Sequence, residues 1–190
     1  MTTTTAQKLL EDGFTRVAET VAGVTADSDA RLLSYRPDNG SNSVAWLVWH
    51  LARVQDDHLA DLAAVLADRM EPATPGEHRV PTGQQWDDGG WADRFALPYG
   101  RHDTGFGHGA ADVAAFSATD GALLAGYHAA VHEATLAVIA NLSDADFDKI
   151  VDRRWEPAVT SLSRLVSVLN DTTQHAGQAA YVRGLAERAR

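Results

Sequence analysis

The 190-residue chain contains no cysteine. This absence excludes disulfides, cysteine-ligated zinc, iron–sulfur clusters and a cysteine nucleophile supplied by the protein itself. The chain also lacks an excess of positive charge, because 26 Asp and Glu residues outnumber 16 Lys and Arg residues and give a formal net charge of −10. A nucleic-acid binder needs a dense basic surface, so we expect no nucleic-acid partner.

Long apolar runs and targeting signals are missing as well. No stretch of about 18 consecutive apolar residues occurs, which argues against a transmembrane helix. Residues 1–14 include Lys8, Glu11 and Asp12 in place of the apolar stretch of a signal peptide. We therefore expect a cytoplasmic protein with no membrane partner. The apolar fraction of 45% is ordinary for a globular protein, and the length predicts a single domain spanning residues 1–190.

Apolar residues recur at spacings of three and four in four stretches, which is the period of an amphipathic helix. These stretches span about residues 5–24, 44–70, 119–141 and 161–187. Asn42 or Ser43 can cap the second helix. Because no stretch carries a strong strand pattern, the sequence predicts an all-α protein built as a four-helix bundle.

A long irregular segment separates the second helix from the third. Residues 71–110 hold eight Gly and four Pro residues, together with five aromatic residues that need an apolar surface to cover. A connection of this length is unusual in a compact domain and tends to be functional. Short loops join antiparallel helices, whereas a long crossover permits parallel ones, so we expect up-down-down-up topology. Short helical turns are predicted at residues 111–116 and 143–151.

Three polar residues on expected helices are candidate metal ligands. His50 lies among apolar neighbours in the second helix, where it is either a ligand or a hydrogen-bonded core histidine. Asp171 and His175 are four residues apart in the last helix, so one face presents a carboxylate and an imidazole about 5.4 Å apart along the axis. Such a pair binds a divalent ion or forms an ion pair at a helix edge.

A second histidine pair, His128 and His132, has the same spacing in the third helix and is the alternative metal pair. The apolar stripe of that helix passes beside both residues, which favours a helix flank or a helix–helix contact. Asp57 lies seven residues after His50 and falls near the same face. It is either an acceptor that orients a ligand histidine or part of a solvated helix end.

Three stretches of the chain resemble the DinB superfamily of four-helix metalloproteins. Within that superfamily they are most similar to an actinobacterial branch related to mycothiol-dependent maleylpyruvate isomerase and mycothiol transferases. The stretches are SVAWLVWHLARVQDDH at 43–58, DTTQHAGQAAYVRG at 171–184, and GFGH at 105–108 followed by DVAAF at 112–116.

The resemblance implies one divalent metal ion held by His50, Asp171 and His175, with zinc or nickel as the expected metal. It also implies thiol chemistry with mycothiol as cosubstrate and a small electrophile as acceptor, in a homodimer. A thiol brought in by a cosubstrate fits a chain that has no cysteine. Residues expected to support the metal or to line the substrate pocket are Trp46, Arg53, Asp57, His108, Gln178 and Arg183. No catalytic residue is assigned, and a non-catalytic metal-binding stress or regulatory bundle and a metal-dependent hydrolase stay open as alternatives.

Overall fold

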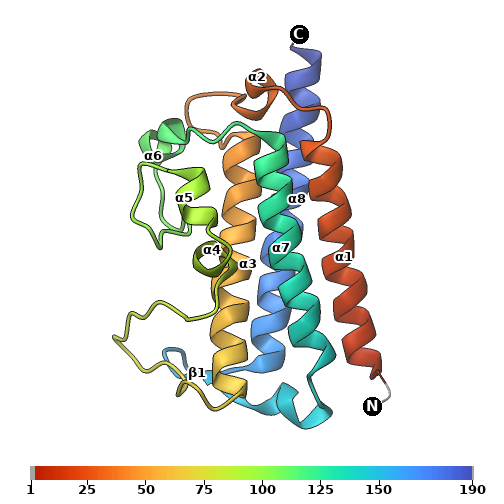
Figure 1. Cartoon of the computed structure of the whole chain (residues 1–190), viewed down its shortest axis with the longest axis vertical. Coiled ribbons are helices and arrows are strands. Elements are labelled where there is room, and N and C mark those ends of the chain that lie inside the picture. Colours follow the sequence, from red (N-terminus) through yellow and green to blue (C-terminus); the bar gives the residue numbers. More distant parts are fainter. Residues whose placement is uncertain (1–2, 190) are drawn as a thin grey trace.

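The structure, a computed structural model, describes residues 3–189, and four long helices dominate it (Figure 1). They are α1 (Thr5–Thr25), α3 (Val44–Leu66), α7 (Gly121–Ala140) and α8 (Ser161–Arg188). In Figure 1, α1 and α8 run upward, whereas α3 and α7 run downward. The predicted four-helix bundle with up-down-down-up topology is confirmed.

The packing of the helices follows from this order. α3 lies antiparallel to α8 and parallel to α7, while α1 lies antiparallel to α7 and parallel to α8. A parallel α3–α7 pair requires the chain to return along the whole bundle between them. The crossover from residue 67 to residue 120 makes that return.

Each long helix begins where a side chain accepts a hydrogen bond from a free backbone N–H group. Thr4 forms a capping box with Gln7, and Ser43 accepts from the N–H of Trp46. Asp120 and Thr160 cap α7 and α8 in the same way. Ser43 is therefore the cap of the second bundle helix, and the four starting points lie within two residues of their predicted positions.

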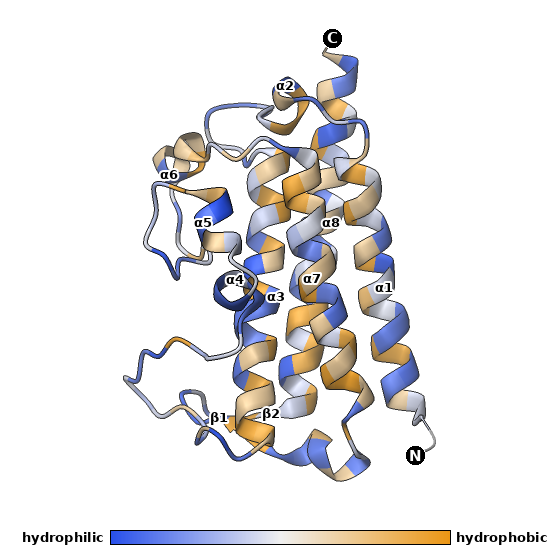
Figure 2. Cartoon of the chain, in the orientation of Figure 1, coloured by the Kyte–Doolittle hydropathy of each residue, from blue (hydrophilic) through white to orange (hydrophobic). Residues whose placement is uncertain are grey.

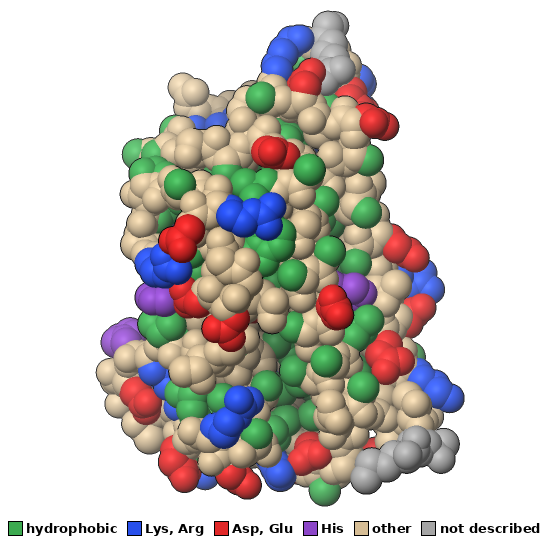
Figure 3. Space-filling view, in the orientation of Figure 1, with side chains coloured by type: hydrophobic (Ala, Val, Ile, Leu, Met, Phe, Trp, Pro, Cys, Tyr) green, Lys and Arg blue, Asp and Glu red, His purple; other side chains and the backbone are tan. Residues whose placement is uncertain are grey.

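The bundle interior contains two apolar clusters. The cluster at the upper end is rich in aromatic residues, including Trp46, Trp49 and Tyr127, and the lower one is built around Phe14 and Ile139. Figure 2 shows apolar and polar residues alternating around the long helices, as expected when each buries one face. On the surface shown in Figure 3, acidic and basic side chains are interspersed.

The crossover carries three short helices, α4 (Gln85–Asp88), α5 (Trp91–Phe95) and α6 (Ala110–Ala115). Trp86, Trp91 and Phe95 are buried, and their rings lie 5.2–5.7 Å from the ring of Tyr127 on α7. The aromatic residues of this segment therefore bind it to the bundle rather than leaving it as a solvated linker.

The structure adds elements that the sequence did not predict. They are α2 (Ala30–Leu33), α4, α5 and an antiparallel pair formed by β1 (Ile150–Asp152) and β2 (Val159–Thr160). The turn predicted at 143–151 is the 3-10 helix η1 (Asp144–Asp148), capped by Ser143 and followed by β1. The strands contain three and two residues, which is too short for an alternating pattern to be visible.

α7 is long and apolar enough to cross a membrane by length and composition alone. Its inward side chains nevertheless pack within the bundle: Leu124, Tyr127 and Val131 are at most 1% exposed. One face of α7 thus packs against the bundle, and 33% of its apolar window is buried.

Candidate metal centre

The structure brings His50, Asp171 and His175 together where α3 and α8 pack antiparallel. One ligand atom from each residue lies within 4.8 Å of the other two. Among residues 3–189, this is the one group of three or more such side chains that can hold a metal ion. His50 is 7% exposed, and the side chains of His175 and Asp171 are 20% and 37% exposed. The site is therefore closed on the α3 side and accessible on the α8 side.

The orientation of His50 is set by the loop that precedes α6. Its Nδ1 atom lies 2.5 Å from the carbonyl oxygen of Thr104 and donates to it, so Nε2 is left as the atom that can bind a metal. The indole of Trp46 stacks on the imidazole at 4.6 Å between ring centroids. Burial lowers the pKa of His50, which keeps the imidazole neutral, the form in which it ligates metals.

Gln178 and Asp171 set the orientation of His175. The Nδ1 atom of His175 donates to Oε1 of Gln178 at 2.8 Å, and its Nε2 atom faces Oδ1 of Asp171 at 3.6 Å. The other oxygen of Asp171, Oδ2, is buried and has no hydrogen-bond partner. A buried carboxylate oxygen without a donor is unfavourable, and a cation between the three side chains would neutralise it. The residues present therefore fit a divalent metal, with two imidazoles and one carboxylate as ligands.

Gly105 allows the loop to approach His50 closely. Its φ is +88°, a conformation that favours glycine. A Cβ atom at this position would lie 2.8 Å from Nδ1 of His50, 2.9 Å from the ring of Trp49 and 3.0 Å from the ring of Trp46. His108 completes the loop: its Nδ1 accepts from the indole N–H of Trp46 at 3.3 Å.

Substituting Gly105 by alanine is expected to weaken metal binding about tenfold to a hundredfold, because the added methyl group displaces the Thr104 carbonyl from His50. Metal affinity measured by competition with a chromogenic chelator tests this expectation. Gly107→Ala is the matched control, since Gly107 also has a positive φ (+80°) but no atom within 4 Å of its Cβ position. Equal losses in both variants would mean that backbone strain, and not contact with His50, is responsible.

Arg53, expected to support the metal or to line the pocket, is placed by the structure behind the loop that orients His50. Its side chain is fully buried, forms an ion pair with Asp56 at 3.5 Å and donates to Gln84 at 2.8 Å. It also lies over the ring of Trp86 and donates to Tyr127. Its Nε also donates to the carbonyl oxygen of Asp103 at 3.3 Å, directly before Thr104. Arg53 therefore anchors the crossover, including the loop that orients His50.

Arg183 is also engaged elsewhere. Its guanidinium donates to the carbonyl oxygens of Gly23, Val24 and Ala26, which end α1, and pairs with Glu187. Cations at a helix C-terminus stabilise its free carbonyl groups. The structure therefore gives Arg183 a capping role in place of the expected contact with substrate.

Asp57 does not orient His50, because the Thr104 carbonyl occupies that position. Burial raises the pKa of Asp57 to about 6. The adjacent His58 lies 3.4 Å from Arg164, and burial, with that arginine, lowers its pKa to about 4. The alternative, that Asp57 belongs to a solvated helix end, is wrong for its neighbours Gln55 and Asp56, which are 0% and 4% exposed.

The alternative pair, His128 and His132, has parallel rings 6.4 Å apart, and no third metal-binding side chain of the described residues joins them. The expectation that both flank the apolar stripe is wrong for His128. It is 2% exposed, and burial lowers its pKa to about 3. His128 is therefore a neutral core residue.

Sequence reasoning missed three residues around the site. Thr104 and Gly105 contribute through their backbone atoms. Their side chains therefore give little indication of this role in the sequence, apart from the Gly-Phe-Gly motif. Asp56 accepts hydrogen bonds from the N–H groups of Gln85 and Trp86, at 2.8 Å each, and thereby begins α4. In the sequence, the one sign of this role is that Asp56 lies three residues after Arg53, at the spacing of an ion pair on a helix.

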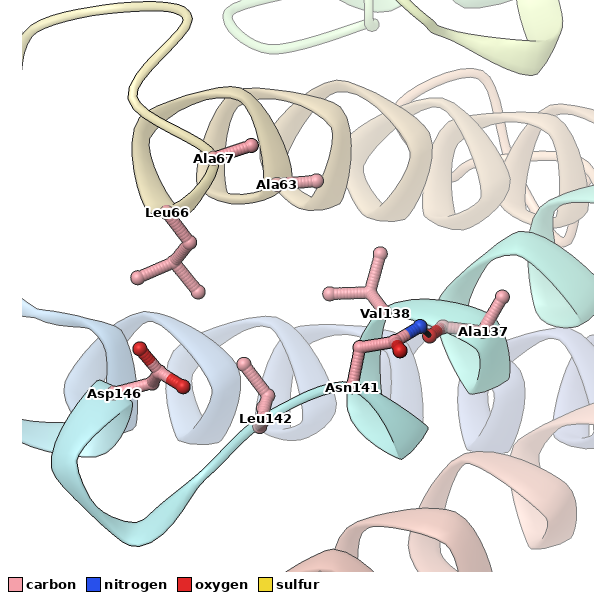
Figure 4. Close-up of a pocket in the computed structure, with 8 residues that line it drawn as sticks. All are labelled: Ala63, Leu66, Ala67, Ala137, Val138, Asn141, Leu142 and Asp146. Carbon is pink, nitrogen blue, oxygen red and sulfur yellow. Dashed lines mark hydrogen bonds between the residues drawn. The ribbon is translucent and has the colours of Figure 1, made fainter.

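A pocket of about 350 Å³ lies away from the metal ligands, between the C-terminal ends of α3 and α7 (Figure 4). Its walls are mostly apolar, and they include Ala63, Leu66 and Val138. Both oxygens of its one carboxylate, Asp146, are occupied by Ser143 and Lys149. The other polar side chain of the pocket, Asn141, donates to the carbonyl oxygen of Ala137 at 2.7 Å.

Comparison with known proteins identifies a family and a solved structure of similar fold. The family model described as the DinB superfamily matches residues 13–179. A crystal structure described as a conserved protein from Enterococcus faecalis superposes with a TM-score of 0.78 at 25% sequence identity. The match covers 94% of this chain and 95% of that one. No curated protein matches the chain in sequence.

Proposed function

The chain belongs to the DinB superfamily, and from this membership and its three clustered ligands we propose a metal-dependent S-transferase. In this proposal a low-molecular-weight thiol such as mycothiol is joined to a small electrophile. The protein acts in the cytoplasm, as a homodimer, and belongs to the actinobacterial mycothiol branch of the superfamily. The observation that carries the proposal is the convergence of His50, Asp171 and His175 within 4.8 Å.

The ligand set supports transfer chemistry because three protein ligands leave coordination positions for other molecules. A divalent ion such as zinc or nickel would lower the pKa of a thiol placed there, so that the sulfur reacts as a thiolate. The protein's own groups hold the ligands in place: Thr104 orients His50 and Gln178 orients His175.

The reaction forms a bond between the thiol sulfur and an electrophilic carbon. The leaving group departs with its bonding electron pair, and the thiol proton passes to solvent through the accessible α8 side of the site. Trp46 and His108 form the apolar and polar parts of the pocket wall next to His50. Phe106 lies two residues before His108 in the same loop. Its side chain is 92% exposed and free to contact the electrophile.

Hydrolysis is the alternative reaction, because a metal lowers the pKa of a bound water as it lowers that of a thiol. His108 uses Nδ1 to accept from Trp46, and its Nε2 faces Asp103 at 4.0 Å. His58 lies beside Arg164, and the charges nearest to Asp57 include Arg53 and Arg154. Thiol transfer is proposed here from the similarity of residues 43–58 and 171–184 to the mycothiol branch.

We expect the protein, loaded with Zn²⁺ or Ni²⁺, to conjugate mycothiol to monochlorobimane faster than the metal-free protein does. Fluorescence of the conjugate measures the rate. The His175→Ala variant should lose the activity because it loses a ligand, whereas His132→Ala should keep it. The absence of conjugation with either metal would contradict the proposal, and thiol-independent ester hydrolysis would instead favour a hydrolase. Metal binding without either activity would favour a regulatory bundle.

A further inference from the structure

The outward face of α8 carries no charge over most of its length. Between residues 162 and 181, every exposed side chain of this helix is uncharged, although charged residues make up 22% of the chain. The titratable residues of the span are Arg164, which is 9% exposed, and the candidate metal ligands Asp171 and His175, which are half-buried. Charged residues are depleted where two protein surfaces pack together, so this face has the composition of an interface.

Exposed apolar side chains gather on the side of this face that borders α1. Leu162 and Val166 are 45% and 53% exposed, and Leu9 of α1 is 69% exposed. The two helices are in close contact at Gly13, where a Cβ atom would lie 2.7 Å from the side chain of Leu169. Leu9 precedes Gly13 by about one turn and Val166 precedes Leu169 by almost one turn. Because the two helices run parallel, Leu9 and Val166 lie at similar heights, and the apolar surface continues from one helix to the other.

Gly177 lies exposed in the middle of this face, and no contact within the chain requires a glycine there. A glycine inside a helix destabilises it relative to alanine. Two other helical glycines have a reason within the chain: a Cβ atom on Gly13 would collide with Leu169, and one on Gly126 would lie 2.9 Å from the ring of Trp91. Around the Cβ position of Gly177 no atom lies within 4 Å. A helix of another molecule that packs closely on α8 would require the small residue.

We propose that two copies of the chain meet through this face of α8, with Leu9 of α1 at its edge, a proposal that rests on the homodimer proposed above. In a twofold dimer the same surface meets itself, so a side chain near the axis lies beside its own copy. A charge there would face a like charge, which costs binding energy. Two chains of net charge −10 therefore associate best through a face without charge, whereas an unlike partner can be recognised by opposite charges.

This interface leaves the metal centre open. Val166 and Asp171 are five residues apart, which separates them by about 140° around the helix axis. Gly177 follows His175 by two residues and so lies on nearly the opposite side of α8. Asp171 and His175 are directed toward His50 on α3, away from the proposed contact. Association and metal binding can therefore be measured independently.

Sedimentation velocity of the metal-loaded chain should show a species of about twice the mass of one chain. Val166→Arg should raise the dimer dissociation constant roughly a hundredfold or more, because it brings like charges together in the interface. Gly177→Leu should raise it roughly tenfold or more, because the added side chain overlaps the partner helix. Leucine is also a better helix former than glycine. A loss of dimer with unchanged or increased helix content by circular dichroism therefore separates association from folding.

Ala129→Arg and Ala129→Leu are the matched controls, at an exposed position of α7, and should leave the dissociation constant unchanged. Dimers that survive both Val166→Arg and Gly177→Leu would overturn the interface and leave the homodimer intact. Loss of the dimer in the Ala129 variants alone would place the interface on α7. A monomeric original chain would overturn the interface and the homodimer together, leaving the face to an unlike partner. Bound metal and mycothiol conjugation per chain, measured on the same samples, should be unchanged in all variants and test the proposed reaction separately.

Discussion

Replacing His50 or His175 by alanine is expected to lower the bound metal from about one ion per chain to about a tenth or less. Each histidine supplies one of three ligand atoms that lie within 4.8 Å of one another. With one imidazole missing, only two ligand atoms remain, and two ligands bind a divalent ion weakly. Inductively coupled plasma emission analysis of protein dialysed after metal loading measures the effect.

His132→Ala is the control for this experiment. It removes an imidazole from a histidine pair of the same spacing, and that pair has no third ligand among the described residues. Full metal content is expected. If His132→Ala lost the metal while His50→Ala and His175→Ala kept it, the metal would be on α7 and our assignment would be wrong. Circular dichroism of each variant verifies that the helices are intact.

The second large effect is expected from Arg53→Leu, which should lower the free energy of unfolding by about 3–5 kcal/mol. The substitution leaves the buried carboxylate of Asp56 without its cation and leaves Gln84 and Tyr127 without a donor. Since these groups bind the crossover to the bundle, its short helices should loosen first. Urea unfolding followed by circular dichroism measures the change as a lower midpoint.

Arg16→Leu removes an arginine from an exposed pair with Asp12, in which the side chains are 73% and 62% exposed. No measurable change in the urea midpoint is expected, because exposed pairs contribute little. Similar losses in Arg53→Leu and Arg16→Leu would mean that burial does not make the Arg53–Asp56 pair important.

The long helices were predictable because their signals are local. Spacings of three and four are visible in the sequence itself, and Ser43 marks a helix start by its own chemistry. The short elements were not, because helices of four or five residues contain little periodicity. α4 begins where Asp56, on a different helix, accepts from the N–H groups of Gln85 and Trp86. That contact joins residues about 30 positions apart, so no local pattern reveals it.

The three candidate metal ligands were predictable in part, between the long helices, which were predictable, and the short elements, which were not. The spacing of Asp171 and His175 is local, and their resemblance to the DinB motifs added His50. Which residues support the candidate ligands could not be predicted, because it depends on the path that the crossover takes over α3. Arg53 and Asp57 occupy sequence positions close to His50, yet Arg53 is enclosed by the crossover and Asp57 faces a different charged group. Thr104, about 50 positions later, is the residue that contacts His50.

The sequence by itself determined the all-α class, the four long helices, the family motifs and the absence of any thiol belonging to the protein. These properties depend on composition and on neighbours a few residues apart. Only the tertiary structure decided which polar residues come together as a possible metal site and which ones anchor the crossover. Segments that are distant in the sequence meet after folding, and they set which side chains are buried and paired. The free-energy cost of burying a charged or polar side chain depends on these neighbours more than on its position in the chain.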